Sequence, residues 1–320
     1  MKRMTAIALA CTFSVGAMAQ SSWPSKPVKV EVPAPAGSSL DIIVRILGEK
    51  LKDRWQQPVV VDNRAGAGGM LGMDVVAKAP PDGYTLGIGF NGPIAFGPYM
   101  YKKMPYDPAK DLIPVVLTTV QPNVLAVPIN NPANTLPEFV AWAKSQGDKV
   151  SYGSVGNGSS SHLTMELFKS VAGFNAVHVP YSGSPPAGTS LAAGETQALF
   201  AVAPALIPLI QGNRVKLIGI TSLKRDESMK ELATIAESGY PGFEALAWNG
   251  LFAPAGTPPD IVARINADVD AVLKDPSVKE ALLKQGLITG GGTPASFKSF
   301  IDSEGTKWGA IIKKVGISID

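Results

Sequence analysis

The first hydrophobic pattern along the chain predicts a strand, a short loop and a helix. Valine alternates with charged residues over residues 28–32, which is typical of a strand with one buried face. Apolar residues then recur at helical spacing over 43–51, and Ser38 or Ser39 is placed to cap this helix. The free N–H groups of the first helical turn would point into the small-residue loop 33–41, which predicts an anion site without a basic side chain. An ordinary strand-to-helix turn of an α/β protein explains this stretch equally well.

A second copy of the arrangement appears more than a hundred residues later. A short strand at 150–153 is followed by a Gly- and Ser-rich loop, residues 154–161, and then by a helix whose apolar face includes Leu163 and Leu167. Gly173 is a typical residue to end this helix. Two such loops favour a protein with two lobes, each of which offers an anion-binding turn to one cleft.

The rest of the chain keeps alternating between strand and helix patterns, which predicts an α/β fold. We expect each lobe to be a mostly parallel sheet flanked by helices. The chain is expected to cross to the second lobe within 114–131 and to return within 243–252, and the helices that follow complete the first lobe. We therefore assign residues 20–120 and 247–320 to the first lobe and residues 121–246 to the second.

The first 19 residues are typical of a secretory leader. Two basic residues, an apolar stretch shorter than the ~20 residues of a membrane span, and small residues at 17–19 match a signal peptide that is cut before Gln20. Cys11 lies inside this leader. A lipoprotein cysteine is the alternative, but Ala8 stands where a large apolar residue would be expected. We expect an exported, soluble protein that is not lipidated.

The composition of the chain limits the classes of partner and of chemistry that we expect. The 320 residues are 45% hydrophobic and 17% charged, which suits about two domains with a substantial core. Without Lys2 and Arg3 of the leader, the 29 basic residues become 27, against 26 acidic ones. This near neutrality argues against a nucleic-acid partner. Because the only cysteine lies in the leader, the mature chain has no disulfide, no Cys-bound metal and no cysteine nucleophile. We expect a monomer.

Motifs for catalysis and for cofactor binding are missing from the sequence. There is no G-x-S-x-G turn, no H-E-x-x-H and no P-loop. The two histidines, His162 and His178, lack partners at the spacing of a metal site. Ser159 with His162 could form a nucleophile–base pair, but a serine there is more often a helix cap. The glycines at 66–68 miss the dinucleotide fingerprint, because Leu71 stands where a third small residue belongs. We expect no cofactor, no metal and no enzymatic activity.

Several segments, in this order and at this spacing, resemble the Bug family, the periplasmic solute receptors of tripartite tricarboxylate transporters. The resemblance covers nearly the whole mature chain. It implies a two-lobed Venus flytrap in the periplasm that closes on a small carboxylate and delivers it to the membrane components of such a transporter. The segments are PAPAG at 33–37 with Asp41, DNRAGAGG at 62–69, PDGYTL at 81–86, YKKMPYD at 101–107, YGS at 152–154, GSSSHL at 158–163, HVPY at 178–181 and LFAPAGTP at 251–258.

The resemblance also implies which residues hold the ligand. In the family, the two small-residue loops grip a carboxylate through backbone N–H groups, hydroxyls and bridging waters. Three further positions are weaker candidates for the wall of the cleft. The implied residues are Ala36, Gly37, Ser38, Ser39 and Asp41 in the first loop, Ser154, Gly158, Ser159, Ser160 and His162 in the second, and Asn91, Tyr181 and Asn249 in the wall.

Two departures from the family pattern bear on the ligand. Gly37-Ser38 replaces a common Gly-Gly pair and adds a hydroxyl to the first loop. Many members carry an aspartate after the phenylalanine that is Phe200 here, whereas this chain has Ala201. An aspartate would suit a ligand amine, so we expect a di- or aromatic carboxylate without one. Two alternatives remain: a related receptor coupled to sensing rather than to transport, and a secreted hydrolase.

Overall fold

The computed structural model describes residues 23–225 and 229–319. The expected leader, residues 1–19, and the expected mature start at Gln20 lie outside the described residues. None of the helices in the described parts of the chain combines the length and apolar character that crossing a membrane requires.

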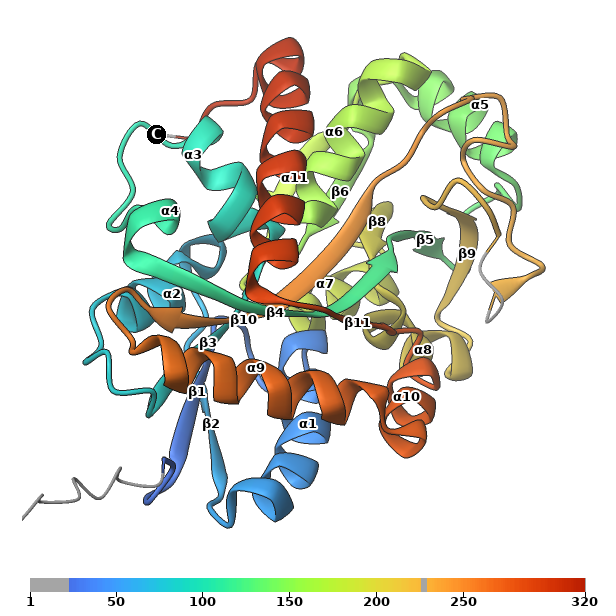
Figure 1. Cartoon of the computed structure of the whole chain (residues 1–320). Helices are drawn as coiled ribbons and strands as arrows, with labels where there is room; N and C mark the ends of the chain where they lie inside the picture. Colours follow the sequence, from blue (N-terminus) through green and yellow to red (C-terminus); the bar gives the residue numbers. More distant parts are fainter. Residues whose placement is uncertain (1–22, 226–228, 320) are drawn as a thin grey trace, which may run out of the picture.

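The first lobe is built on a six-stranded sheet in the order β11-β4-β10-β3-β1-β2 (Figure 1). β1 pairs in parallel with β2 and β3, whereas β10 runs antiparallel to both β3 and β4, and β11 runs antiparallel to β4. The strands are β1 (Val28–Val32), β2 (Val59–Asn63), β3 (Thr85–Phe90), β4 (Leu112–Pro122), β10 (Leu246–Pro254) and β11 (Ile288–Gly291).

Helices cover both faces of this first sheet. The apolar core on one face includes residues of α1, α9 and α10, and that on the other includes residues of α2 and α11. The helices and helical turns of the lobe are α1 (Ser39–Trp55), η1 (Ala67–Gly69), α2 (Met70–Ala77), η2 (Gly92–Phe96), α3 (Gly97–Met100), α4 (Pro108–Asp111), α9 (Pro259–Lys274), α10 (Pro276–Leu283) and α11 (Pro294–Val315).

The second lobe contains a five-stranded sheet in the order β7-β6-β8-β5-β9. β6 is parallel to β7 and β8, and β5 is antiparallel to β8 and β9. The core on one face includes residues of α5 and α6, and that on the other includes residues of α7 and α8. The elements are β5 (Val124–Pro128), α5 (Leu136–Gln146), η3 (Gly147–Lys149), β6 (Ser151–Ser154), α6 (Ser160–Ala172), β7 (Val177–Pro180), α7 (Ser184–Ala193), β8 (Ala198–Ala201), α8 (Ala203–Gln211) and β9 (Val215–Ile220).

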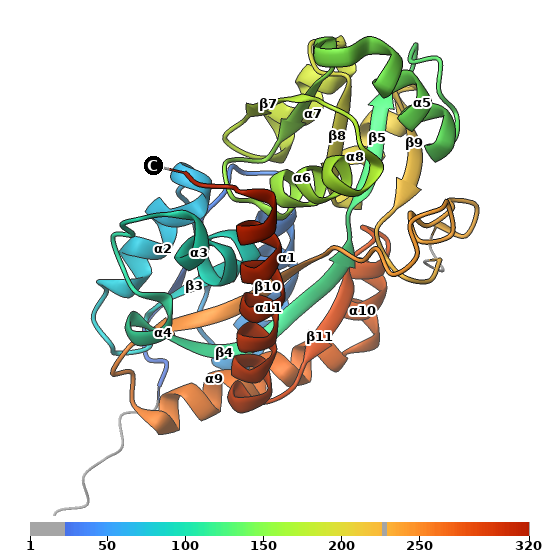
Figure 2. The same ribbon diagram turned by 90° about the horizontal axis from the view of Figure 1, so that it is seen from above.

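The predicted two-lobed α/β fold is confirmed, but both sheets are mixed rather than mostly parallel. The strands that connect the lobes take part in the antiparallel pairs, because β4 leads into β5 and β10 brings the chain back beside β4 (Figure 2). β11 then adds to β4 from within the first lobe. A period-2 pattern carries no information on strand direction, so the sequence could not reveal this. The strand ends lie next to the lobe boundaries that we propose at 120/121 and 246/247.

Asn123 fixes the point where the chain changes sheets. It is the single residue between β4 and β5, and it is 1% exposed. Its backbone N–H donates to the Thr221 hydroxyl at 2.8 Å, and its amide donates to the Thr164 hydroxyl and to the Ala245 carbonyl. The first crossing is thereby tied to α6 and to the residue just before β10, which makes the return crossing.

Close packing of β10 gives a direct test of the fold. A Cβ at Gly250 would lie 2.0 Å from Cζ of Phe297, which is 1% exposed. We expect Gly250→Ala to lower the free energy of unfolding by about 1–3 kcal/mol, because a buried aromatic ring must shift. Gly305→Ala in α11 is the control. The nearest atom to its Cβ would be the Tyr99 hydroxyl oxygen at 3.6 Å, which is an ordinary contact, and helix propensity favours alanine over glycine by up to ~1 kcal/mol. Urea unfolding measures both, and equal stability of the two variants would contradict this packing.

Candidate ligand-binding cleft

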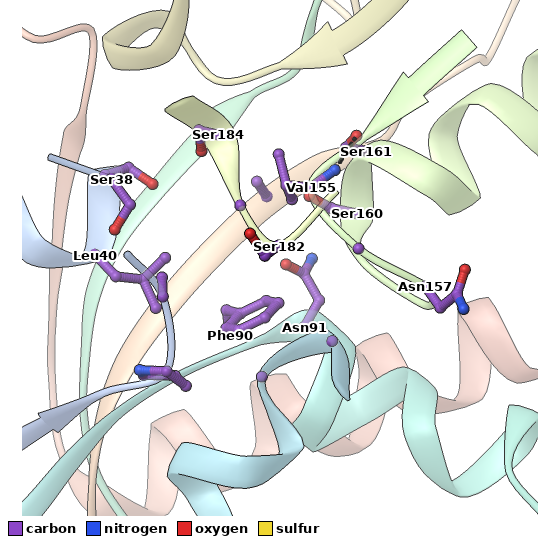
Figure 3. Close-up of a pocket in the computed structure, with 18 of the residues that line it drawn as sticks. Ser38, Leu40, Phe90, Asn91, Val155, Asn157, Ser160, Ser161, Ser182 and Ser184 are labelled. Atoms are coloured by element: carbon purple, nitrogen blue, oxygen red, sulfur yellow. Dashed lines mark hydrogen bonds between the residues drawn. The ribbon is translucent and has the colours of Figure 1, made fainter. Parts of the chain in front are cut away.

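One cavity of about 400 Å³ lies where the carboxyl ends of strands from both sheets meet (Figure 3). Residues from both lobes line it, including Ser38 and Phe90 from the first lobe and Val155 and Ser160 from the second. None of the described residues in its wall carries a charged side chain. An anion in this cavity would therefore have to be held by neutral donors.

The loop before α1 directs such donors inward. Gly37 has φ +78°, a conformation that favours glycine, and its N–H donates to the Asp41 carboxylate at 2.9 Å. The Ser38 hydroxyl caps α1 by accepting from the Asp41 N–H. Burial would raise the pKa of Asp41, but hydrogen bonds from Arg45 and from Gly37 outweigh it and hold that pKa below its ordinary value. The carboxylate thus stays charged and fixes the turn.

The loop before α6 has the same geometry with different residues. Gly158 has φ +71°, and its N–H donates to Nδ1 of His162 at 3.1 Å. The Ser159 hydroxyl accepts from the His162 N–H, and the backbone of Ser159 matches that of Ser38 within 1° in both φ and ψ. A neutral histidine therefore takes the place that an aspartate has in the first loop.

These two turns leave equivalent donors free. The residue after each cap, Ser39 in α1 and Ser160 in α6, lines the cavity and is 5% and 8% exposed, respectively. No described residue accepts a hydrogen bond from either hydroxyl or from the N–H groups of the first two helical positions. Such groups have no partner inside a helix, so they are available to a ligand. Figure 3 shows Ser38 and Ser160 on opposite sides of the cavity.

The predicted residues divide into two groups. One group lines the cavity: Ser38, Ser39, Asn91, Ser160, Tyr181 and Asn249. The other group does not line it. Within this group, Gly37, Asp41, Gly158 and His162 shape the loops through the hydrogen bonds described above. The second group consists of Ala36, Gly37, Asp41, Ser154, Gly158, Ser159 and His162.

Sequence reasoning missed several residues of the wall. Gly68 drew attention as part of an incomplete dinucleotide fingerprint, yet a Cβ there would lie 2.3 Å from the Asn157 carbonyl oxygen of the other lobe. A Cβ at Gly183 would similarly lie 2.5 Å from Cδ of Pro35. Ser184, the first residue of α7, is 8% exposed and lines the cavity. Small residues were the only available signal, and they did not indicate that two lobes meet there.

Two stacked histidines lie behind the second loop. The rings of His162 and His178 are 3.9 Å apart and nearly parallel, and Nε2 of His178 lies 2.6 Å from the Ser154 hydroxyl. Burial lowers the pKa of His162 to about 4. Burial together with the neighbouring His162 lowers the pKa of His178 to about 3, although nearby Glu166 acts in the opposite direction. Both rings are therefore neutral at pH 7, as the acceptor role of His162 requires.

This pair predicts a pH dependence of stability. Both pKa values lie below the ~6.5 of a histidine in an unfolded chain, so the unfolded state binds protons first as the pH falls. The free energy of unfolding should therefore decrease between about pH 6.5 and pH 4, and the melting temperature should drop by several degrees. We expect His178→Phe to show a smaller drop, because one titrating ring is removed and the stack is kept. Scanning calorimetry at several pH values checks this, and parallel curves for the two proteins would contradict it.

Comparisons with known proteins place this geometry in a family. The model described as "Tripartite tricarboxylate transporter family receptor" matches residues 43–317. A UPF0065 protein from the tcbD-tcbE intergenic region of Pseudomonas sp. strain P51 is 39% identical over 97% of this chain and 92% of its own length. BugT of Bordetella pertussis is 34% identical over 93% of this chain and 92% of its own length.

Solved structures agree with these sequence matches. Rpa4515 of R. palustris, determined with adipate, superposes with a TM-score of 0.90 at 35% identity and covers 92% of this chain and 99% of its own. MatC of Rhodopseudomonas palustris, with bound malate, has a TM-score of 0.86 at 31% identity over 91% of this chain and 100% of its own. Members of this family are substrate-binding receptors and not enzymes. The chain therefore belongs to the Bug family of tripartite tricarboxylate transporter receptors, as its sequence motifs implied.

Proposed function

We propose that this protein is a periplasmic receptor that captures a small carboxylate in the cleft between its lobes and delivers it to a tripartite tricarboxylate transporter. The observation that carries the proposal is the matched pair of turns before α1 and α6. Each presents a buried serine hydroxyl, Ser39 or Ser160, and free N–H groups to a cavity without charged walls. Adipate and malate in two related structures support a carboxylate as the ligand.

The energetics explain why both turns are needed. A helix N-terminus stabilises an anion by ~0.3–1 kcal/mol when exposed and by up to ~2 kcal/mol when partly buried. One turn alone would hold a carboxylate weakly in water. Closure of the lobes brings the second turn to the same group and excludes water, which strengthens every contact in the cavity. The contacts between Gly68 and Asn157 and between Gly183 and Pro35 fit such a closed arrangement.

The remaining wall residues indicate which kind of group the ligand carries besides its carboxylate. Ala201 and Val202 line the cavity at the place where many family members have an aspartate, and Leu40, Met70 and Phe90 add apolar surface. No described residue of the wall offers an acidic partner for an amine. We therefore favour a di- or aromatic carboxylate without an amino group. We also propose that the leader exports the protein and that it acts as a monomer. The alternative function is a receptor of the same family that is coupled to sensing rather than to transport.

Ligand screening tests the proposed class. We expect at least one of succinate, adipate, malate, benzoate and phthalate to raise the melting temperature of the mature protein, because only the folded state binds it. The matching primary amides keep the shape and lose the charge, so they should produce no shift. A shift with the amides equal to that with the acids would contradict the carboxylate assignment.

Matched charge variants test the two turns. Ser39→Glu and Ser160→Glu each put a like charge where the carboxylate would bind, and each should weaken binding of the best acid by roughly 100-fold or more. Both residues start a helix, where an acidic side chain is tolerated, so the ligand-free fold should persist. The double variant should lose little more than either single one if both turns hold one group. Calorimetry measures the affinity of each variant. The control is Ser277→Glu, which adds the same charge at an exposed residue in the first turn of α10. Unchanged affinity in either single variant would remove that turn from the site.

A further inference from the structure

The segment that follows α11 returns to the cleft. Gly316 ends the helix with φ +76°, and its N–H donates to the Ile312 carbonyl at 2.9 Å. The segment then runs toward α3, as the red trace near the end of the chain in Figure 1 shows. The Ile319 N–H donates to the Met100 carbonyl at 3.0 Å, and Ile319 pairs in parallel with Tyr101. Main-chain pairing therefore fixes this segment on the first lobe.

Ile319 is also part of the cavity wall, and it lies against the second lobe. It lines the cavity together with Tyr101 and Asn157. A Cβ at Gly158 would lie 2.5 Å from Cε of Met100 and 3.7 Å from Cδ1 of Ile319. The side chains of Met100 and Ile319 thus cover the glycine that precedes the α6 cap.

Three segments of the first lobe converge on this one turn of the second. Gly68 approaches the Asn157 carbonyl, the Tyr101 hydroxyl lies 3.5 Å from the same carbonyl oxygen, and Ile319 lies beside Gly158. Loop 156–158 leads directly into Ser159 and Ser160, which start α6. The contacts of the first lobe with loop 156–158 therefore position the first turn of α6, and they also close one side of the cavity.

We propose that residues 317–319 form a seal of the ligand cavity, in which Ile319 closes the side next to loop 156–158 and slows the release of bound ligand. An apolar side chain at this place excludes water from the donors of α6, and dissociation requires the contact with loop 156–158 to open. The role of these residues as a seal goes beyond capture of a carboxylate, and its effect on release rests on that proposed function.

Ligand release provides the first test. Ile319→Ala should raise the dissociation rate and the dissociation constant of adipate by roughly 5- to 30-fold, with a nearly unchanged association rate, because a contact of the half-buried Ile319 side chain in the cavity wall is lost only from the closed state. Stopped-flow fluorescence and calorimetry measure these values, and malate is the second probe.

Ser318→Ala is the matched control, because Ser318 is exposed and does not line the cavity. A variant that ends at Gly316 should behave at least as severely as Ile319→Ala. Unchanged release in Ile319→Ala and in the shortened chain would overturn the seal.

Hydrogen exchange in the ligand-free protein separates this inference from the proposed function. Ile319→Ala should speed amide exchange in loop 156–158 and leave α9, on the far face of the first sheet, unchanged. If no carboxylate binds the parent protein, the proposed function fails and the effect on release fails with it, while exchange still decides whether the contact exists. Sound carboxylate binding with unaltered exchange and release overturns the seal alone.

Discussion

The cleft depends on a constraint of helix geometry: the first N–H groups of a helix have no partner within it. In this protein two turns of the same shape, Gly37-Ser38-Ser39 and Gly158-Ser159-Ser160, bring those groups to one cavity. Each turn uses its glycine N–H to anchor itself on the residue four positions later, Asp41 or His162. The anchoring residues stay out of the cavity wall, so the donors that face inward remain neutral and uncommitted.

The arrangement of the two sheets determines where the cavity lies. Helices that follow parallel strands begin at the carboxyl edge of a sheet, and here two such edges face each other across the chain crossings at β4–β5 and before β10. Asn123 ties the two crossings together by hydrogen bonds. Small residues allow close approach where the lobes touch, at Gly68 against Asn157 and at Gly183 against Pro35. Neutral donors from both lobes thereby surround a space from which water can be excluded.

Local patterns made much of this predictable. The period-2 valines of β1, the serine caps of α1 and α6 and the glycine after α6 each follow from short-range chemistry, and the family motifs supplied the flytrap. Strand direction was not predictable, because β10 takes its place in the sheet from contacts with β4, which lies more than a hundred residues away in sequence. Ser184 and Ile319 reach the cavity for the same reason, since tertiary packing places them. The family resemblance implies a ligand role for His162, and in the structure its ring accepts a hydrogen bond from the Gly158 N–H and does not line the cavity.

In the proposed complex, the first turns of α1 and α6 bind the same carboxylate. The most direct measurement is the amide proton shift of Ser39 and of Ser160 in the isotope-labelled protein as the best-binding acid is titrated in. Both signals should move downfield, as expected when an N–H donates to a carboxylate, and both should follow one binding curve. A shift at only one of the two residues, or two curves with different affinities, would contradict a shared grip.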